Sequence, residues 1–392
     1  MRGKSKKKKP IEAYQLGRWR LLSEYQRHLN DAFTGSTLHP TWEDPQRRLL
    51  ITEYTSLFLL GIFNPIITSM RGLCQASRLE KVQEVASKRA VSIGSFSEAQ
   101  HVLDPALLKK VYESLAREVA SRRKPAANAS EAQIPNLTIV DSTLWYALPD
   151  MEWAVWRKQY ITQKAFRLHV QFNVLDNMPT ELSIKEGRRC ERKEWEAMAK
   201  PGEIYVGDRY YGEDYRLFRR LDERGCSFVV RLRSDAQWVE EEELVVDAAT
   251  RQKGVIGHSW VRLGKEGLGP RVRVVRVLAD DEQILIATNL SVEGMSAEWV
   301  SLCYRQRWQV ELFFRWLKHI MKADHWMAQS QAGVAIQIYL TLIAAQLLLL
   351  FSGQRPNKRS MELLQFMVMG WATPEEVVAL LKKAATKQKR AS

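Results

Sequence analysis

The sequence predicts a mixed α/β protein in which a strand-rich middle is flanked by helical regions on both sides. Apolar residues recur at helical spacing through residues 11–123 and again through residues 296–380. Between these regions, β-branched runs and alternating apolar and polar residues are typical of strands. Strand and helix patterns interleave in this middle, which favours one mixed sheet over separate all-α and all-β folds.

The chain is long and basic. Its 392 residues are 45% hydrophobic, which is enough for a sizeable core and more than one domain. Lys and Arg number 59 against 45 Asp and Glu, a net charge of +14, so nucleic acid is the first partner to consider. Residues 1–10 hold six Lys/Arg and residues 382–392 hold five, with no acid in either tail. These tails are either solvated disorder or a source of salt-sensitive attraction to phosphate.

Compartment and membrane signals favour the cytoplasm. Four widely spaced cysteines contain no CxxC pair, so neither a zinc box nor a disulfide framework is expected. No apolar stretch follows the basic N-terminus, so no signal peptide is predicted. Residues 334–351 are almost apolar enough for a membrane span, but Gln337 and Gln346 interrupt them and no second span exists. We therefore expect a buried core helix and no membrane partner.

The first elements after a linker at residues 124–135 are strands. NLTIVDSTLW predicts a strand that ends at Asp141, and AFRLHVQFNVLD and PTELSIKEG predict two more, joined by a turn at Asp176 and Asn177. KEWEAMAK is expected to be a helix, GEIYVGDRYYG a strand that ends at Asp208, EDYRLFRRLDERG a helix closed by Gly225, and CSFVVRLR a strand. The predicted order is therefore β-β-β-α-β-α-β.

A second strand-rich block and a long helix follow. HSWVRLG, RVRVVRVLA and ILIATNL are strand-like, with a hairpin turn over residues 279–282. SAEWVSLCYRQRWQVELFFRWLKHIMK predicts one helix that starts at a Ser cap and carries Glu311 in its middle. The predicted domains are a basic tail at 1–12, a helical DNA-binding region at 13–130, the first part of the core at 131–234, a β-rich insert at 235–292, a catalytic helix at 293–326, and C-terminal helices with a basic tail at 327–392.

Three acidic residues form the candidate catalytic set. Asp141 and Asp208 follow apolar strands, and strand ends beside a cleft are where α/β sheets place ligand groups. On the long helix, Tyr304, Arg307, Glu311 and Lys318 are separated by three, four and seven residues, which places all four along one stripe. Alone, that stripe could be an exposed face with an Arg307–Glu311 salt bridge worth a few tenths of a kcal/mol. The two strand-end aspartates favour a catalytic interpretation.

The chain resembles the DDE transposases of bacterial insertion sequences, in the branch defined by a Y-x2-R-x3-E-x6-K signature. YRQRWQVELFFRWLK fits that spacing without a gap. DSTLWYALPD resembles the first-aspartate motif of the family, and GDRYYGEDYRLFRRLDERGCSFVVRLR resembles the second. SFSEAQHVLD is similar to the upstream helical region, so the likeness runs from about residue 50 to about residue 350.

The resemblance implies a ribonuclease-H-like catalytic core with a β-rich insert, flanked by an all-helical N-terminal region and C-terminal helices. It implies that Asp141, Asp208 and Glu311 bind two Mg²⁺ ions, with Mn²⁺ as a substitute, and that Tyr304, Arg307 and Lys318 contact DNA phosphates. The implied activity is cut-and-paste transposition. The terminal inverted repeats are bound and cleaved through hairpin ends, and the 3′-hydroxyl ends are joined to target DNA by a homodimer in a synaptic complex. Such a protein acts in the bacterial cytoplasm, on the nucleoid when it is bound to DNA.

The chemistry is consistent with the residues themselves. Two divalent ions can serve both the attacking and the leaving oxygen of a phosphodiester. Mg²⁺ prefers hard carboxylate oxygens, whereas zinc would need His or Cys, and none is clustered near these acids in the sequence.

Two DNA-contact assignments stay open at this stage. Arg209 either binds DNA or pairs with a carboxylate. Some family members receive a flipped base on an aromatic ring of an insert strand, where this chain has Ile284. Either Trp308 or an insert tryptophan, Trp238 or Trp260, takes over, or base flipping differs. This departure concerns the hairpin step and not the cutting step.

Two other functions compete with transposition. One is a transposase-derived DNA-binding protein that no longer cuts, and the other is a metal-dependent nuclease of the same fold that does not transfer strands. The acidic triad argues against a pure binder, because carboxylates repel phosphate. The helical N-terminal region and the insert favour a transposase that grips a specific DNA end.

Overall fold

The computed structural model describes residues 20–34, 36–122, 136–158, 161–279, 282–293, 295–323, 325–352 and 355–391. The chain divides into two compact units. Unit 1 contains Met1–Lys124, Leu148–Trp153 and Arg315–Ser392, and unit 2 contains Pro125–Ala147 and Ala154–Phe314. The N-terminal basic tail and the 124–135 linker of the sequence analysis lie outside the described residues.

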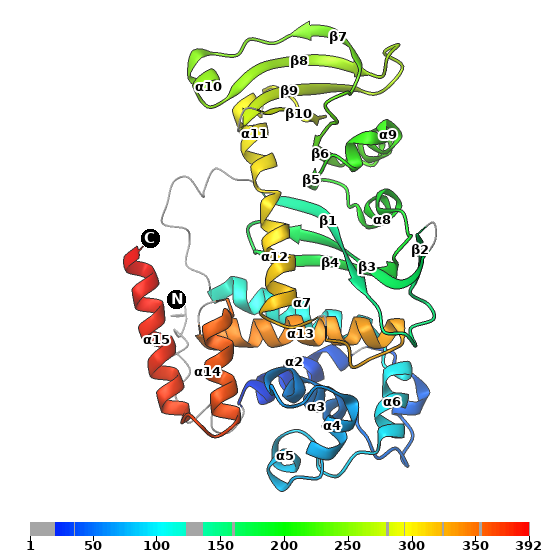
Figure 1. The fold of residues 1–392 in the computed structure, drawn as a ribbon, viewed down its shortest axis with the longest axis vertical. Coiled ribbons are helices and arrows are strands. Elements are labelled where there is room, and N and C mark those ends of the chain that lie inside the picture. Colours follow the sequence, from blue (N-terminus) through cyan, green and yellow to red (C-terminus); the bar gives the residue numbers. More distant parts are fainter. Residues whose placement is uncertain are drawn as a thin grey trace, which may run out of the picture. The chain divides into compact units, whose positions relative to one another are not determined.

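Unit 1 is helical, as its periodicity predicts. Its central helix, α13 (Gln331–Ser352), packs against α7, α3 and α2 (Figure 1). The N-terminal helices are α2 (Arg20–Phe33), a 3₁₀ turn η1 (Pro40–Trp42), α3 (Ile51–Phe63), α4 (Met70–Ala76), α5 (Glu80–Val85), α6 (Ile93–Val102) and α7 (Pro105–Arg122), and the C-terminal helices are α14 (Lys358–Val368) and α15 (Pro374–Ala391).

The apolar helix α13 is a core helix, as the sequence analysis expects. Its segment Gln331–Leu350 is long and apolar enough to cross a membrane, yet 83% of its most apolar window is buried inside the protein. The interrupting amide of Gln337 is satisfied, since it accepts from Met327 N at 3.0 Å and donates to the His325 carbonyl at 2.6 Å. The second interrupting amide, Gln346, is buried and has no hydrogen-bond partner among the described residues. The burial of the window is typical of a core helix.

Unit 2 is built on one ten-stranded mixed sheet with the order β2-β3-β1-β5-β6-β10-β9-β8-β7, in which β4 pairs with the remaining part of β3. Its strands are β1 (Leu137–Tyr146), β2 (Val155–Lys158), β3 (Ile161–Asn173), β4 (Met178–Glu186), β5 (Ile204–Gly207), β6 (Ser227–Arg231), β7 (Trp238–Glu243), β8 (Val255–Leu263), β9 (Arg271–Ala279) and β10 (Glu282–Thr288). Its helices are α8 (Glu191–Met198), the 3₁₀ turn η3 (Tyr211–Glu213), α9 (Tyr215–Glu223), α10 (Ala248–Gln252) and α11 (Ala297–Arg305).

The core strands have the ribonuclease-H-like order β4-β3-β1-β5-β6. β1, β3 and β4 are antiparallel neighbours, and β5 and β6 then run parallel to β1. The helices α8 and α9 make the two crossovers of this parallel part, as predicted. The β-rich insert extends the same sheet, because β10 pairs antiparallel with β6 and continues into β9, β8 and β7 (Figure 1).

Several sequence predictions hold at residue level. Asn177 has a φ of 53° in the β3–β4 turn, and Gly225 has a φ of +69° just after α9, which are left-handed conformations that Asn and Gly tolerate. Ala279 pairs with Glu282 across the insert hairpin, whose two central residues lie outside the described part. β2, β7 and α10 were not predicted, because four to six residues without alternation leave little sequence signal.

Two predictions were wrong in detail. The first strand does not end at Asp141 but continues to Tyr146, because beyond Asp141 it keeps pairing with β3 through Tyr146 and Ala165. The long helix is not continuous either. It is interrupted at Gln306–Arg307 and resumes as α12 (Trp308–His319), which begins in unit 2 and ends in unit 1.

The predicted domain boundaries stay a prediction. The two compact units follow packing, so the N-terminal and C-terminal helices share one unit and the insert shares the other with the core strands.

Candidate active site

Two carboxylates meet at one edge of the parallel part of the sheet. β1 and β5 pair in parallel only as far as Ile139 and Val206. Asp141 and Asp208 each stand two residues beyond that last pair, so the pleat carries both to the same edge. Asp208 leaves the sheet there, whereas Asp141 stays paired with Val170 of β3.

Close packing holds the loop that follows β5. A Cβ atom on Gly207 would lie 2.9 Å from the ring of the buried Trp195, so this position favours glycine. A Cβ atom on Gly212 would collide with the carbonyl oxygen of Arg231. Asp208 itself accepts a hydrogen bond from the Tyr210 amide at 3.0 Å, which orients its carboxylate.

Asp141 carries an unfavourable charge. Burial raises the pKa of its carboxyl, and together with the negative charges of Asp208 and Glu191 it brings this pKa from 3.8 to about 7. The Ser142 amide, which donates to Asp141 Oδ1 at 2.7 Å, and the nearby Arg307 oppose that rise. A buried carboxyl beside other carboxyls is stabilised by any cation that joins it.

The third acid comes from the helical segment. Gln306 and Arg307 donate backbone hydrogen bonds to Cys303 and Tyr304, three residues earlier, at 3.1 and 3.0 Å, which is 3₁₀ rather than α geometry. The predicted single stripe therefore crosses a helix break. Arg307 nevertheless contacts Glu311, and its Nη1 lies 3.7 Å from Asp141 Oδ2, so the guanidinium joins the helix acid to the strand acid.

Packing decides which way α12 presents Glu311. Val310 and Phe313 are fully buried, and the ring of Phe313 lies 5.3 Å from that of Phe172 on β3. Glu311, on another face, keeps 33% of its side chain exposed. Trp308 is 49% exposed, because it stands at the helix break rather than within a continuous helix.

Tyr304 belongs to the same cluster. Burial raises the pKa of its phenol, and its electrostatic neighbours are Arg307, Arg231 and Asp208. Arg231 hydrogen-bonds the phenol. The structure thus brings together Asp141, Asp208, Tyr304, Arg307 and Glu311. Lys318 stands at the far end of α12, in unit 1, and its predicted phosphate contact stays a prediction.

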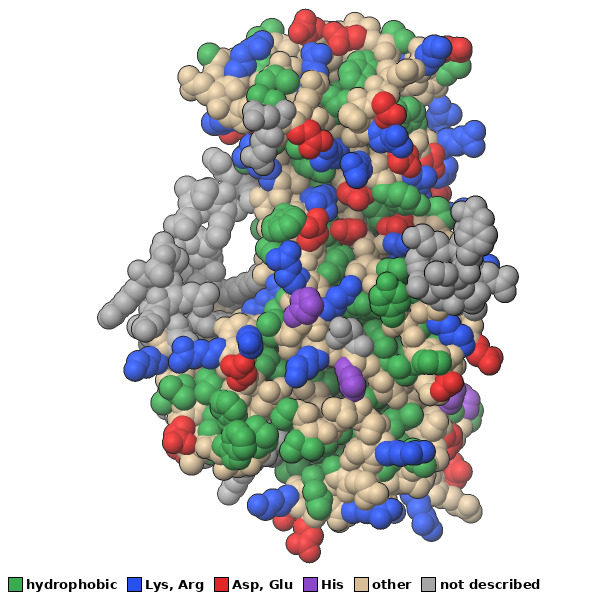
Figure 2. Space-filling view, viewed as in Figure 1, with side chains coloured by type: hydrophobic (Ala, Val, Ile, Leu, Met, Phe, Trp, Pro, Cys, Tyr) green, Lys and Arg blue, Asp and Glu red, His purple; other side chains and the backbone are tan. Residues whose placement is uncertain are grey.

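A basic cleft adjoins Asp208. It has a volume of about 320 Å³ and is lined by Arg209, Glu213, Arg231, Leu232, Arg233, Ser234 and Glu282. Arg209 is exposed and forms no ion pair within the described residues, so the carboxylate-pairing alternative has no partner there. Arg231 pairs with Glu282, and Arg233 lies 3.2 Å from Glu213. On the face drawn in Figure 2, acidic side chains gather with Lys and Arg around them.

Sequence reasoning missed a polar network next to Asp141. Ser142 Oγ donates to Glu191 at 2.5 Å, and Arg167 Nη1 donates to Glu191 at 2.6 Å and to Ser142 Oγ at 3.0 Å. These residues come from β1, β3 and the first turn of α8, so no spacing rule connects them. Arg231 was also missed, although it ends the strand next to β5 and the edge argument could have found it.

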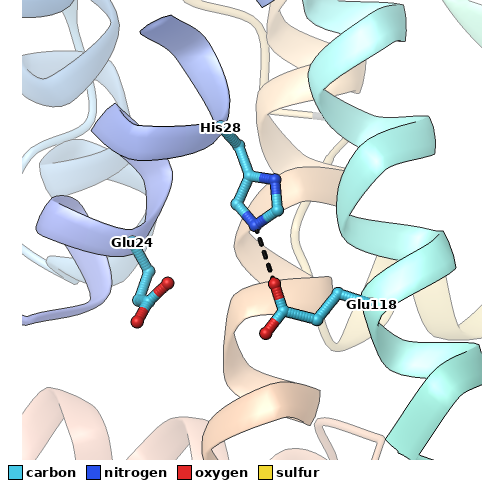
Figure 3. Close-up of side chains that lie close together, drawn as sticks. All are labelled: Glu24, His28 and Glu118. Atoms are coloured by element: carbon cyan, nitrogen blue, oxygen red, sulfur yellow. Dashed lines mark hydrogen bonds and ion pairs between the residues drawn. The ribbon is translucent and has the colours of Figure 1, made fainter. Parts of the chain in front are cut away.

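A second cluster of metal-ligating side chains lies in unit 1. The donor atoms of Glu24, His28 and Glu118 lie within 4.8 Å of one another, from α2 and α7 (Figure 3). The Arg27 Nη2 atom lies 2.9, 3.0 and 2.8 Å from the nearest atoms of these three residues. The guanidinium therefore takes the position that a cation would need.

The edge cluster fits a divalent cation better. Its donors are hard carboxylate oxygens, which divalent cations such as Mg²⁺ prefer. It also contains more acids than bases. Two arginines face four acids, namely Arg167 and Arg307 against Asp141, Asp208, Glu191 and Glu311. Both the donor chemistry and the raised pKa of Asp141 therefore match an oxygen-binding metal.

Comparison with known proteins agrees with this chemistry. Residues 133–347 match the family model described as the transposase DDE domain. A protein described as a transposase for insertion sequence element IS4SA in Synechocystis sp. is 24% identical over 300 residues, which cover 74% of this chain and 79% of the relative. A transposase-like protein of element IS5377 in Geobacillus stearothermophilus is 26% identical over 54% of this chain and 55% of its own.

Two further proteins also match. The transposase for insertion sequence element IS421 in Escherichia coli is 24% identical over 47% of this chain and 60% of its own. The cryo-EM structure of the piggyBac transposase synaptic complex with hairpin DNA covers 95% of this chain and 81% of its own, at 9% identity and a TM-score of 0.39. Because the family model spans more than half of the sequence, this chain belongs to the DDE transposases, in the group found in bacterial insertion sequences.

Proposed function

We propose that this protein excises its element by metal-dependent hydrolysis at the terminal inverted repeats and joins the freed 3′-hydroxyl ends to target DNA in the bacterial cytoplasm. The observation that supports this most is the meeting of Asp141 and Asp208 at one sheet edge, with Glu311 linked to Asp141 through Arg307. Four acids share two arginines there, and an excess of like charges destabilises a buried edge unless a cation joins it.

The proposed metal ligands are Asp141, Asp208 and Glu311, and the proposed ions are two Mg²⁺ with Mn²⁺ as a substitute. When bound, the ions supply positive charge at the attacking and leaving oxygens of a phosphodiester. The remaining tasks fall to the protein. Ser142 and Tyr210 orient the two aspartates through their backbone amides.

Arg307 has two roles that exclude one another. In the structure its guanidinium neutralises Glu311 and Asp141. Once cations neutralise these acids, the planar fork becomes available to grip a phosphate next to the scissile bond. Tyr304 and Lys318 are proposed to bind phosphates on the same strand, and Arg209, with Arg231 and Arg233 of the cleft, the phosphates further along.

Hairpin formation at the cut end is the finer part of the proposal. It requires a distorted DNA end, and an exposed aromatic ring can hold an unstacked base. Trp308 is 49% exposed and next to Arg307. It is therefore a better candidate than Trp238, which packs against a buried core cluster, and Trp260, whose ring is covered by Arg271. Synapsis of two ends requires two copies of the chain, so we expect a homodimer on DNA.

The test is incubation of the purified protein with a duplex that carries the flanking inverted repeat, in Mg²⁺, Mn²⁺, Ca²⁺ or EDTA. We expect cutting in Mg²⁺ and Mn²⁺, and binding with little cutting in Ca²⁺, whose larger and looser coordination positions a nucleophile poorly. Cutting in EDTA would eliminate the metal mechanism. Binding without cutting would identify a transposase-derived DNA binder, and cutting without joining of 3′ ends would identify a nuclease.

A further inference from the structure

A fully buried arginine lies in the insert, away from every acid of the active site. Arg273 of β9 is 0% exposed. Its Nε donates to His258 Nε2 on β8 at 3.0 Å. Its two amino groups donate to three backbone carbonyls, those of Leu290 at 2.9 Å, Ser291 at 2.7 Å and Met295 at 2.8 Å. Four hydrogen bonds thus use most of its five donors.

This arginine is not part of an ion pair. Within the described residues no carboxylate lies within 4.0 Å of Arg273, and burial lowers its pKa to about 10. A buried charge without a counterion is costly, and an apolar side chain of similar size would avoid that cost. The feature that only arginine supplies here is a rigid fork that binds several carbonyls at once.

The three carbonyls belong to the segment that leads into the catalytic helices. β10 ends at Thr288 and α11 begins at Ala297, capped by Ser296, whose Oγ accepts from the Trp299 amide at 3.2 Å. Arg273 therefore binds both the beginning and the end of the connection. Strand β9 is paired with β10 on one side and β8 on the other, so the Arg273 side chain extends from a firmly held backbone.

A short path joins this anchor to the active site. α11 is nine residues long, packs its buried Val300 and Cys303 toward the sheet, and ends just after Tyr304. The 3₁₀ break follows at once and carries Arg307, and Glu311 lies one turn into α12. A shift at the start of α11 therefore moves Tyr304 directly, because a helix moves as a rigid element. It reaches Arg307 and Glu311 through the two-residue break that joins α11 to α12.

We propose that Arg273 is a positioning residue that holds the start of α11, and through it sets the distance of Tyr304, Arg307 and Glu311 from Asp141 and Asp208. The insert then helps to position the catalytic side chains, in addition to enlarging the DNA-contacting surface. The inference rests on the proposed cleavage function only for its activity measurements.

The experiment compares the full chain with Arg273→Met, Arg273→Lys and the control Arg271→Met. Arg271 is on the same strand, pairs with Glu241 and lies over the Trp260 ring, so its replacement removes an arginine without touching the connection. Hydrogen exchange of amides 290–305 is measured without DNA. We expect exchange about tenfold faster or more in Arg273→Met, an intermediate effect in Arg273→Lys, and wild-type exchange in Arg271→Met.

Cleavage is then measured under single-turnover conditions across a divalent-ion titration. Misplacement of Glu311 is expected to lower the rate by about 10- to 100-fold and to raise the Mn²⁺ concentration for half-maximal cleavage, with end binding within about twofold of wild type. A merely destabilising change would reduce the active fraction without moving that midpoint. If Arg273→Met does not fold, as judged by its melting curve, Arg273→Lys decides the question.

The inference is overturned if a folded Arg273 variant exchanges like wild type between residues 290 and 305, or cuts with an unchanged Mn²⁺ midpoint. If the wild-type protein does not cut the inverted repeat at all, the proposed function fails, whereas the exchange comparison still decides whether Arg273 holds α11.

Discussion

Two clusters in this molecule combine acids with an arginine, and they differ in charge balance. In unit 1, Glu24, His28 and Glu118 surround Arg27, and Arg122 adds a second cation to Glu118. In unit 2, Asp141, Asp208, Glu191 and Glu311 face Arg167 and Arg307. The first cluster is neutral with His28 uncharged, since burial lowers the pKa of that imidazole.

The difference separates a structural contact from a cation site. The unit 1 cluster satisfies the spacing expected of metal ligands, yet each acid already has a guanidinium partner. The edge cluster of unit 2 has carboxylates in excess, and the pKa of Asp141 is raised to about 7. Geometry alone would choose the first cluster, whereas charge balance chooses the second.

The largest effect is expected from the three acids. Asp141→Ala, Asp208→Ala and Glu311→Ala should each lower end cleavage by about a thousandfold or more, because each removes a proposed metal ligand. End binding and folding should largely survive, since the change relieves repulsion at the edge. Single-turnover cleavage, gel-shift binding and melting curves measure these effects. A near wild-type rate in one variant would remove that residue from the ligand set.

The second-largest effect on cleavage is expected when Arg307 is replaced by lysine. Arg307→Lys keeps the charge but loses the planar fork, so cleavage and hairpin yield should fall by about 10- to 100-fold. The matched control is Lys318→Arg on the same signature, where we expect a change within about threefold. If Arg307 only makes a surface salt bridge with Glu311, both variants would cut normally and lose a few tenths of a kcal/mol of stability instead.

Asp141→Asn should reveal the charge excess as a pH dependence. A folded-state pKa of about 7 lies above the ordinary 3.8, so the folded protein holds this proton more tightly than the unfolded chain does. Protonation therefore stabilises the fold fully below pH 4, and this contribution is lost as the pH rises through 7. In metal-free buffer at pH 8, Asp141→Asn should be more stable than wild type by roughly 2 to 4 kcal/mol, and about equal at pH 4.

Denaturant unfolding at pH 4 and pH 8 measures this difference. Saturating Mn²⁺ should shrink or reverse it at pH 8, because only the wild-type carboxylate gains from the cation. Equal stability of the two proteins at pH 8 without metal would show that the edge carries no strained charge.

The smallest effect is expected in the balanced cluster. Arg27→Met should lower the free energy of unfolding by about 1 kcal/mol, since Arg27 is half exposed and Arg122 still pairs with Glu118. Cleavage by the folded protein should be unchanged. The control is Lys109→Met, which removes a cation from a 3.8 Å helical pair on α7 and should have less effect still.

Metal ions test whether Arg27 blocks a latent site. Zn²⁺ or Mn²⁺ should leave the melting temperature of Arg27→Met unchanged relative to the Lys109→Met control. A metal-dependent rise in melting temperature confined to Arg27→Met would show that the unit 1 cluster binds a metal ion once Arg27 is removed. Charge balance would then not distinguish the two clusters.

Local sequence patterns predict many of the elements and the candidate acids of this protein. Apolar periodicity identified the helical regions and the core strands, because burial imposes a period of 3.6 or 2 on any sequence that must hide one face. A nearly continuous apolar run at 334–351 identified the buried helix, which spans Gln331–Ser352 in the structure. Two strand-following aspartates and a signature on one helical segment were enough to select Asp141, Asp208 and Glu311. Local caps such as Ser296 and Gly225 were also readable, since they depend on the nearest few residues.

How these parts meet depends on contacts between segments that are far apart in the chain. Register placed Asp141 beside Asp208 while extending β1 past the predicted end, because pairing with a distant strand, β3, outweighs any local stop signal. The break at Gln306–Arg307, the Ser142–Arg167–Glu191 network and the buried Arg273 all depend on contacts between residues far apart in the chain. Such contacts leave no periodic trace in a single sequence, since their energy comes from partners that only the folded chain brings together.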